Sequence, residues 1–337
     1  MSRKCTAMGI VGGGVLVAAS IGFVASSAGA APDPAAAPAF PTHVSAPYVD
    51  TGLSNTTLTS VAGADGTKYF TLAFVDGANC QWSMPNTSGW QSQISDLRAA
   101  GGDVAVSFGG YTTDTNGTDL GNACASADDA ATQIEAVVTT LNVSRLDFDI
   151  ESSQLTNTAD ITRTNQALAK VKSWASGSGR ALSISYTIPT APTGLTSDGL
   201  NVLSDGRSNG FTPDVVNVMT MDYGSSGTEM GDAANQALDA VAGQVAGAYG
   251  VSSAQAYGML GTTPMIGQND SAGEVFSLDD ASSVVSHAKS QGIAQVSFWA
   301  EGRDNGGCAG QTTASSTCSG VSQNDGDFTK AFQQFAG

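Results

Sequence analysis

Basic residues are scarce in this chain of 337 residues, which has 13 Lys and Arg against 30 Asp and Glu and a formal net charge of -17. A surface this acidic repels phosphate backbones and anionic lipid headgroups, so we expect neither nucleic acid nor a membrane as partner. Histidine is scarcer still, with only His43 and His287. There is no H-E-x-x-H motif, no G-x-S-x-G motif and no phosphate-binding glycine loop with Lys. Zinc proteolysis and Ser-His-Asp hydrolysis are therefore disfavoured, and we expect no metal and no cofactor.

Cysteine is also rare. Besides Cys5 near the N-terminus, the chain contains Cys80, Cys124, Cys308 and Cys318, an even number without metal-ligand spacing. In an oxidising compartment two disulfides are expected. Four cysteines allow several pairings, which the sequence does not fix. A local bridge between Cys308 and Cys318 would close a Gly/Ser/Thr-rich stretch and leave Cys80 to pair with Cys124.

Only one long apolar run is present, at residues 8–24. Arg3 and Lys4 precede it and the small residues 28–30 follow it, which is typical of a signal peptide over residues 1–30. We expect a secreted, extracellular protein without a lipid anchor.

After the predicted signal, residues 31–43 are rich in Ala and Pro and predict an extended spacer. Residues 44–337 contain no internal repeat and no second composition block, which indicates one large catalytic domain that acts as a monomer. Obvious tracks of aromatic residues are lacking, which favours a soluble or amorphous substrate over a crystalline one.

Hydrophobic runs and helical patterns alternate through this domain. Eight runs are predicted as strands, at residues 45–49, 69–75, 104–108, 146–150, 182–188, 215–221, 258–266 and 295–299. The clearest helices are predicted at residues 90–100, 127–141, 159–175, 233–249, 279–291 and 327–335. Eight strands with intervening helices predict an α/β fold, a (β/α)8 TIM barrel, with a doubly wound open sheet as the main alternative.

The most informative segment is the fourth predicted strand. Asp147, Asp149 and Glu151 alternate there with Leu, Phe and Ile, so the three carboxylates share one face. Two steps along a strand separate side chains by roughly 6 to 7 Å, which suits an acid/base pair around one reacting bond. An amphipathic edge strand would show the same alternation. In a parallel sheet covered on both faces, however, the carboxylates would be buried, and buried charges of this kind indicate function.

Other polar, glycine and aromatic residues follow the predicted strands, where TIM barrels build their active sites. These residues are Ser107, Gly109, Gly110, Asp222, Tyr223, the stretch 268–270 and Trp299. Each has a structural alternative, since the glycines serve tight turns and a Trp is more often core than ligand platform. Together with Asp149 and Glu151 they form five groups at five strand ends, which makes a common site the better explanation.

These residues resemble glycoside hydrolase family 18, the chitinase family, across almost all of the predicted mature chain. Asp147, Asp149 and Glu151 match the last three positions of its D-x-x-D-x-D-x-E motif. Residues 107–110 match its S-x-G-G motif, Trp299 matches the Trp that ends the eighth strand, and residues 218–224 are similar to its M-x-Y-D motif. Two positions depart from the pattern: Ser144 replaces the first Asp, and Met221 stands where the family often has Tyr.

The resemblance implies roles for the acidic residues. Glu151 would be the general acid and Asp149 would orient the N-acetyl group of the substrate, whose carbonyl oxygen is the nucleophile. Asp147 would share a proton with Asp149. Asp222 and Tyr223 would hold the acetamido group, with the Tyr223 hydroxyl as one replacement for the family's Tyr. This substrate-assisted route retains anomeric configuration.

The resemblance and the strand ends also suggest substrate contacts. Trp299 would form the floor under the reacting sugar, and Gln268 and Asn269, with Asp270, would line the leaving-group side. The remaining candidate sugar contacts are Ser107, Gly109, Gly110, Met219, Met221, Tyr186 and Trp82.

The predicted function is a secreted chitinase that cleaves β-1,4 bonds between N-acetylglucosamine units, with chitin or N-acetylglucosamine oligosaccharides as its partners. A catalytically silent sugar-binding barrel is one alternative. An endo-β-N-acetylglucosaminidase acting on N-glycans is another, because it uses the same motif. Members of the family that only bind sugar commonly lose the acid at the position of Glu151, so its presence favours an enzyme.

Overall fold

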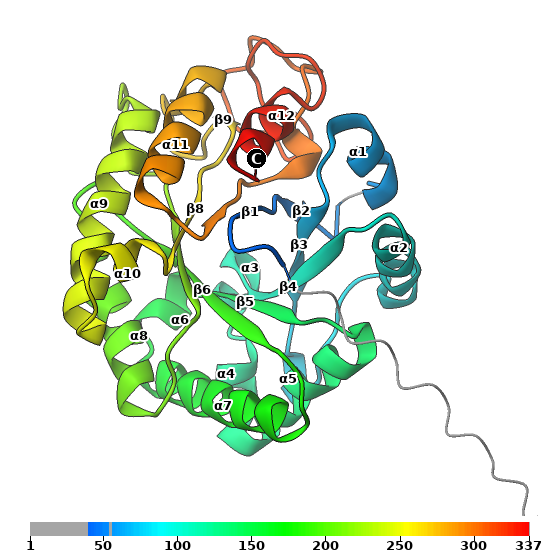
Figure 1. Ribbon diagram of the computed structural model, residues 1–337, viewed down its shortest axis with the longest axis vertical. Helices are drawn as coiled ribbons and strands as arrows, with labels where there is room; N and C mark the ends of the chain where they lie inside the picture. The colour runs from blue at the N-terminus through cyan, green and yellow to red at the C-terminus, as the bar shows by residue number, and fades with distance from the viewer. Residues whose placement is uncertain (1–39, 54–55, 337) are drawn as a thin grey trace, which may run out of the picture. The chain divides into compact units, whose positions relative to one another are not determined.

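A computed structural model describes residues 40–53 and 56–336, and the structural statements below concern these residues. Its strands lie at the centre of the domain and its main helices surround them (Figure 1). All neighbouring strands of the central sheet run parallel. In the order of the sheet, the strands are β1 (Val44–Ser45), β11 (Gln295–Val296), β8 (Leu260–Thr263), β7 (Val215–Met219), β6 (Ser183–Pro189), β5 (Arg145–Asp149), β4 (Asp103–Gly109), β3 (Tyr69–Val75) and β2 (Tyr48–Asp50).

The sheet is closed, because β1 and β2 are two halves of one barrel strand. β1 pairs with β11 and β2 pairs with β3, and only Ala46 and Pro47 separate the two halves. Pro47 has no N–H to donate, which interrupts the ladder at this point. The predicted (β/α)8 barrel is therefore confirmed, and the alternative of an open sheet is wrong.

Helices follow the strands in the order expected of such a barrel. The longer ones are α1 (Leu58–Asp65), α2 (Thr87–Ala99), α5 (Ala127–Leu141), α7 (Thr158–Gly177), α8 (Ser197–Ser208), α9 (Met230–Tyr249), α11 (Leu278–Gln291) and α12 (Asp327–Gln333). Shorter elements extend the loops: α3 (Tyr111–Asn116), α4 (Leu120–Ala123), α6 (Ser152–Thr156), α10 (Ser253–Tyr257) and the hairpin of β9 (Gly267–Gln268) and β10 (Val275–Phe276).

The sequence patterns did not predict α1 and α8, and several predicted strands are too long. Glycine and serine dilute the helical pattern of α8, although Thr196 caps its start and Val202 and Leu203 are buried. The predicted strand at residues 215–221 ends instead at Met219, shortly before Asp222 adopts a positive φ of 52°. The backbone turn after Met219 thus ends the strand earlier than the hydrophobic pattern predicts.

The barrel interior is polar where many TIM barrels pack branched aliphatic residues. The buried interior side chains include Thr71, Ser107, Asp147, Ser185, Thr187, Asn217 and Thr263. Apolar strand residues such as Phe108 and Phe148 belong instead to the main hydrophobic core. A charged group is therefore accommodated at the barrel centre, because hydroxyl and amide partners surround it.

The last residues of the predicted spacer at 31–43 belong to the folded domain. Phe40 packs on Tyr69 with ring centroids 4.8 Å apart, and the Arg145 guanidinium lies 4.8 Å from the centre of the Phe40 ring. His43 Nδ1 is 2.8 Å from the carbonyl oxygen of Ile293. Residues 40–43 thus contact the folded domain, while residues 31–39 of the predicted spacer and the predicted signal at 1–30 lie outside the described residues.

Within the described ranges, no helix has the length and apolar character needed to cross a bilayer.

The structure has the pairing with a local Cys308–Cys318 bridge, which is one of the pairings that the sequence leaves open. Cys80 bonds to Cys124 across 44 residues, which ties the loop after β3 to the end of α4. Cys308 bonds to Cys318 within the loop that precedes α12.

Removing the Cys80–Cys124 bridge by replacing both cysteines with Ser is expected to lower the free energy of unfolding by about 4 kcal/mol, because it closes the longer loop. Replacing Cys308 and Cys318, which close a loop of 10 residues, is the matched comparison, with an expected loss of about 3 kcal/mol. Urea unfolding of both variants measures the difference. An equal or larger loss from the second pair would contradict the prediction.

Candidate functional site

A cleft of about 1010 Å³ opens at the C-terminal ends of the barrel strands. Its lining comes from β2, β3, β4, β5, β6, β7 and β8 and from the loops that follow them. Among the predicted site residues, those that line it are Gly109, Asp149, Glu151, Met219, Met221, Asp222, Asp270 and Trp299. The barrel thus brings Gly109 and Trp299, which are 190 positions apart in the sequence, into one cavity.

Asp147 lies below the cleft, inside the barrel, and is 3% exposed. Four hydroxyl groups donate hydrogen bonds to its carboxylate: Tyr48 (2.8 Å), Ser107 (2.7 Å), Ser185 (2.7 Å) and Thr187 (2.8 Å). Burial raises the pKa of Asp147 and these hydrogen bonds lower it. The prediction that Ser107 contacts the substrate is wrong, because Ser107 is fully buried and its hydroxyl is bound to Asp147.

Asp149 stands at the end of β5 and is 6% exposed. Its Oδ1 has no hydrogen-bond partner among the described residues. Burial raises the pKa of Asp149 well above its ordinary value, and the charges of Glu151, Asp147 and Asp114 raise it further. The carboxyl group is thus held in the cleft with hydrogen-bonding capacity that the protein itself leaves unused.

Glu151 follows two residues later, at the start of α6, and is partly exposed to the cleft. Burial raises the pKa of Glu151 to about 7; the backbone N–H of Tyr111 lowers it and the charge of Asp222 raises it. A carboxyl group with a pKa near neutrality can both give and take a proton at the pH of most aqueous environments, which suits an acid/base catalyst.

Asp114, on α3, fixes the backbone at Glu151. It is fully buried, and its Oδ2 accepts a hydrogen bond of 2.9 Å from the backbone N–H of Glu151. Burial raises the pKa of Asp114 to about 9. Sequence reasoning missed this residue, because Asp114 lies in a Thr- and Asn-rich stretch that is typical of an ordinary loop.

The two glycines of the S-x-G-G motif act through their lack of a side chain. Gly109 has a φ of 90°, and a Cβ there would lie 2.3 Å from the carbonyl oxygen of Asp149. Gly110 has a φ of 83°, and a Cβ there would lie 2.8 Å from the Phe74 ring. Gly109 therefore allows β4 to approach β5 closely, and Gly110 leaves room for the Phe74 ring of β3. Gly110 itself does not line the cleft, so its predicted sugar contact is not found.

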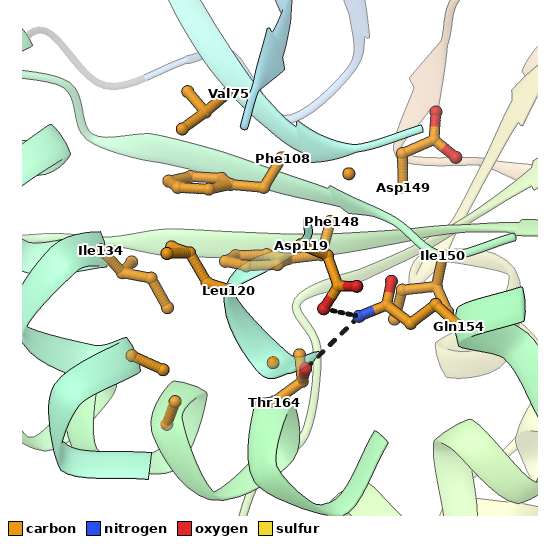
Figure 2. A pocket seen from close by; sticks show the side chains of 14 residues that line it. Val75, Phe108, Asp119, Leu120, Ile134, Phe148, Asp149, Ile150, Gln154 and Thr164 are labelled. Carbon is orange, nitrogen blue, oxygen red and sulfur yellow. Dashed lines mark hydrogen bonds between the residues drawn. The ribbon is translucent and has the colours of Figure 1, made fainter. Parts of the chain in front are cut away.

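A small cavity of about 20 Å³ lies behind β5, on the side of the strand opposite the Asp149 carboxylate (Figure 2). Gln154 of α6 donates hydrogen bonds there to Asp119 (3.1 Å), Asp160 (3.2 Å) and Thr164 (3.4 Å). Burial and the neighbouring Asp119 raise the pKa of Asp160 to about 8. This buried polar cluster anchors α6, the helix that begins directly after Glu151.

Asp222 forms part of the opposite wall of the cleft. Its backbone N–H donates to Asn269 Oδ1 (3.2 Å), and its Oδ1 accepts from the backbone N–H of Ser271 (2.7 Å). The predicted sugar contacts at Asn269 and Gln268 are not found, since neither residue lines the cleft. Asn269 is 3% exposed and its Nδ2 donates to backbone carbonyls, while the carbonyl of Gln268 accepts a hydrogen bond from the buried Arg303. Both residues support the wall from behind.

Tyr223 does not reach the cleft. Its ring packs against the main core, its hydroxyl is buried without a partner among the described residues, and its backbone N–H donates to Glu274 (2.9 Å). The prediction that Tyr223 holds the acetamido group is therefore wrong for this structure. The side chains at Met221 and Asp222 face the cleft instead, because the chain turns at the positive φ of Asp222.

Two other predicted sugar contacts lie elsewhere. Tyr186 is fully buried on the outer face of β6, where its hydroxyl donates to Asn165 and its ring meets the edge of Phe211 at 5.4 Å. Strand alternation explains the error, since Ser185 and Thr187 on either side point into the barrel. Trp82 packs against the main core and does not line the cleft.

Trp299 lines the cleft beside two aromatic residues that the sequence did not single out. Its ring stacks on Phe74 (5.6 Å between centroids) and lies 6.0 Å from Tyr48. Tyr111 also lines the cleft and is 67% exposed. Tyr48 and Phe74 are typical of core strands in the sequence, and only the closure of the barrel places them next to Trp299.

Among the described residues, no group of three His, Cys, Asp or Glu side chains converges on a position where a metal ion would be held. The cleft therefore offers carboxylates, backbone groups, methionines and aromatic rings. Together, these groups can bind a sugar by stacking and hydrogen bonding and can transfer a proton within the bound molecule.

The chain is similar in sequence to two chitinases. The chain is 40% identical to the probable bifunctional chitinase/lysozyme of Escherichia coli (strain K12) over 285 residues, which are 79% of this chain and 31% of that protein. It is 39% identical to endochitinase 11 of Metarhizium anisopliae over 282 residues, 79% of this chain and 53% of that protein. The chain thus spans about a third and about half of these two relatives.

A solved structure matches over nearly its whole length. It is the catalytic domain of the hyperthermophilic chitinase from Pyrococcus furiosus, with 30% identity, a TM-score of 0.81, and coverage of 89% of this chain and 97% of that one. Catalytic-site mutants of active domain 2 of a chitinase from the same organism have been solved with chito-oligosaccharides. No family model matches the chain. The close match in sequence and fold over the whole Pyrococcus domain shows that this chain belongs to the chitinase-like family of glycoside hydrolases, family 18.

Proposed function

We propose that this protein hydrolyses the β-1,4 bonds of chitin and N-acetylglucosamine oligosaccharides with retention of anomeric configuration. The observation that carries the proposal is the pair at the end of β5, where Glu151 has a pKa of about 7 and Asp149 has an unpartnered oxygen in the same cleft. The relatives support it, since they are named as chitinases and the Pyrococcus domain has been solved with chito-oligosaccharides.

In this mechanism the substrate provides the nucleophile. Glu151 gives its proton to the glycosidic oxygen, and the bond from that oxygen to the anomeric carbon breaks. The acetamido carbonyl oxygen of the same sugar forms a bond to the anomeric carbon, which produces an oxazolinium ion. Water then attacks the anomeric carbon from the side of the leaving group, and Glu151 takes a proton from this water. The oxazolinium ring opens, the acetamido group is restored, and the anomeric configuration is retained.

Asp149 and Asp147 support the first step. Oδ1 of Asp149 is free to accept the N–H of the acetamido group, which turns the carbonyl oxygen toward the anomeric carbon. Asp147 lies beneath Asp149 and receives four hydroxyl hydrogen bonds. Its charge raises the pKa of Asp149 and would stabilise the positive charge of the oxazolinium ion.

We further propose that the protein is exported and acts outside the cell as a monomer. Support comes from the predicted signal at residues 1–30 and from two disulfides, which persist in oxidising compartments. N-terminal sequencing of the exported protein should find a start near Ala31, and gel filtration should give the mass of one chain.

Glu151→Gln should reduce kcat on a chitin hexamer by about 10² to 10⁴-fold, because the amide cannot donate a proton to the leaving oxygen. Binding of the hexamer should persist, since the amide has nearly the shape of the acid. Glu135→Gln makes the same change on α5, outside the cleft, and serves as the control. Hydrolysis by Glu151→Gln at the rate of this control would remove Glu151 from the acid role.

The pH dependence of kcat/KM provides a second test. Glu151 must be protonated to act as the acid, so kcat/KM should fall as the pH rises through its pKa of about 7. The negative charge of Asp222 raises this pKa. Asp222→Asn removes that charge, so the pKa should fall and the alkaline limb should move to lower pH. A limb that stays in place or moves to higher pH would contradict the assignment.

A further inference from the structure

The cleft is lined by acidic residues without basic ones. Among the described residues that line it, none is Lys, Arg or His. Its acidic lining residues are Asp50, Asp76, Asp149, Glu151, Asp222 and Asp270. The reaction described above uses Asp149 and Glu151, and Asp222 acts on the pKa of Glu151. Asp50, Asp76 and Asp270 have no role in that chemistry.

The cleft acids are not neutralised by ion pairs, since none of them is in a salt bridge of the described chain. Asp50 accepts hydrogen bonds from the backbone N–H groups of Gly52 and Leu53. Asp76 accepts from the backbone N–H of Ala78 and the hydroxyl of Thr118. These neutral donors orient the carboxylates but leave their charge in place.

Arg303 interacts electrostatically with Asp222 and Asp270, which form one wall of the cleft. Its pKa is raised by the charges of Asp270 and Asp222 and lowered, to a greater degree, by burial. Arg303 is 2% exposed, and its guanidinium donates to the carbonyls of Ile266, Gln268 and Ser315. One buried guanidinium thus stands behind the wall, while Asp270 is exposed at its surface.

The cleft acids other than Asp149 and Glu151 lie on both sides of β5. Asp50 ends β2 and Asp76 directly follows β3, whereas Asp222 and Asp270 follow β7 and β9. In the sheet, β2 and β3 lie on one side of β5 and β7 lies on the other. Sugars bound to either side of the reacting unit would therefore meet negative charge. Asp149 lines the same cleft, is 6% exposed, and its Oδ1 has no hydrogen-bond partner among the described residues, so the cleft also holds an acceptor that the protein leaves unused.

We propose that the cleft selects chitin chains in which units flanking the reacting sugar are deacetylated. This inference rests on the proposed function. A glucosamine unit carries a 2-ammonium group in mildly acidic solution, which the flanking carboxylates attract. The reacting unit keeps its N-acetyl group, because that group supplies the nucleophile. Glycans that bear carboxylates are repelled by the same charges, so peptidoglycan and carboxymethyl chitin are poor substrates.

The test compares a fully acetylated N-acetylglucosamine hexamer with a hexamer in which two units are deacetylated. Binding of each to the Glu151→Gln variant is measured by calorimetry at pH 5.5, in about 20 mM and about 500 mM NaCl, where the Debye length falls from roughly 20 Å to roughly 4 Å. We expect the deacetylated hexamer to bind about ten-fold more tightly at low salt and to lose this advantage at high salt. Equal affinities at low salt, or a preference that salt does not change, would overturn the proposal.

Two double variants test whether the preference for the deacetylated hexamer arises in the cleft. Asp50→Asn with Asp270→Asn, in the Glu151→Gln background, should lower the affinity ratio of deacetylated to acetylated hexamer several-fold. Asp96→Asn with Asp198→Asn removes the same charge from exposed positions on α2 and α8 outside the cleft. This control should leave the ratio as it is. An equal fall in both double variants would assign the effect to net charge and would refute selection by the cleft.

Turnover by the wild type separates this proposal from the proposed function. Hydrolysis of the acetylated hexamer without any charge preference in binding would leave the chitinase function standing and refute the selection. A salt-dependent binding preference without hydrolysis of either hexamer would support the selection and refute the enzymatic function. Faster cleavage of peptidoglycan or carboxymethyl chitin than of the neutral hexamer at low salt would also refute the selection.

Discussion

The buried carboxylate of Asp147 is the constraint around which the site is built. A lone carboxylate in a barrel interior would be unfavourable by several kcal/mol, and four hydroxyl groups from three strands offset this by hydrogen bonding. Tyr48 comes from β2, Ser107 from β4, and Ser185 and Thr187 from β6. The barrel interior must be polar to satisfy one charge, and that charge in turn raises the pKa of Asp149 above it.

Close approach of β4 and β5 is the second requirement. Gly109 and Gly110 leave room for the carbonyl of Asp149 and the ring of Phe74, where any side chain would collide. The same approach brings Asp114 to the backbone of Glu151. Glu151, the proposed general acid, is therefore positioned through its main chain, while its side chain faces the cleft. This arrangement lets Glu151 exchange a proton without disturbing the bonds that hold it.

Strand alternation explains both the successes and the errors of the sequence analysis. It correctly placed Asp147 and Asp149 on the interior face of one strand, because the pattern was read within a continuous element. It did not show that Tyr186 faces outward or that the chain turns at Asp222 and buries Tyr223. Those outcomes depend on where a strand stops and on which neighbours fill the space beyond it.

The sequence by itself determined the barrel and the acidic strip of β5, since these rest on periodicity and local motifs, whereas it left the disulfide pairing open. The tertiary structure decided which candidates reach the cleft. Ser107 is hydrogen-bonded to Asp147, and Asn269 accepts from the backbone N–H of Asp222, so neither lines the cleft. Tyr48 donates to Asp147, and Asp114 accepts from the backbone N–H of Glu151, although both come from segments without a recognisable motif. These assignments depend on contacts between residues far apart in the chain, which no local pattern records.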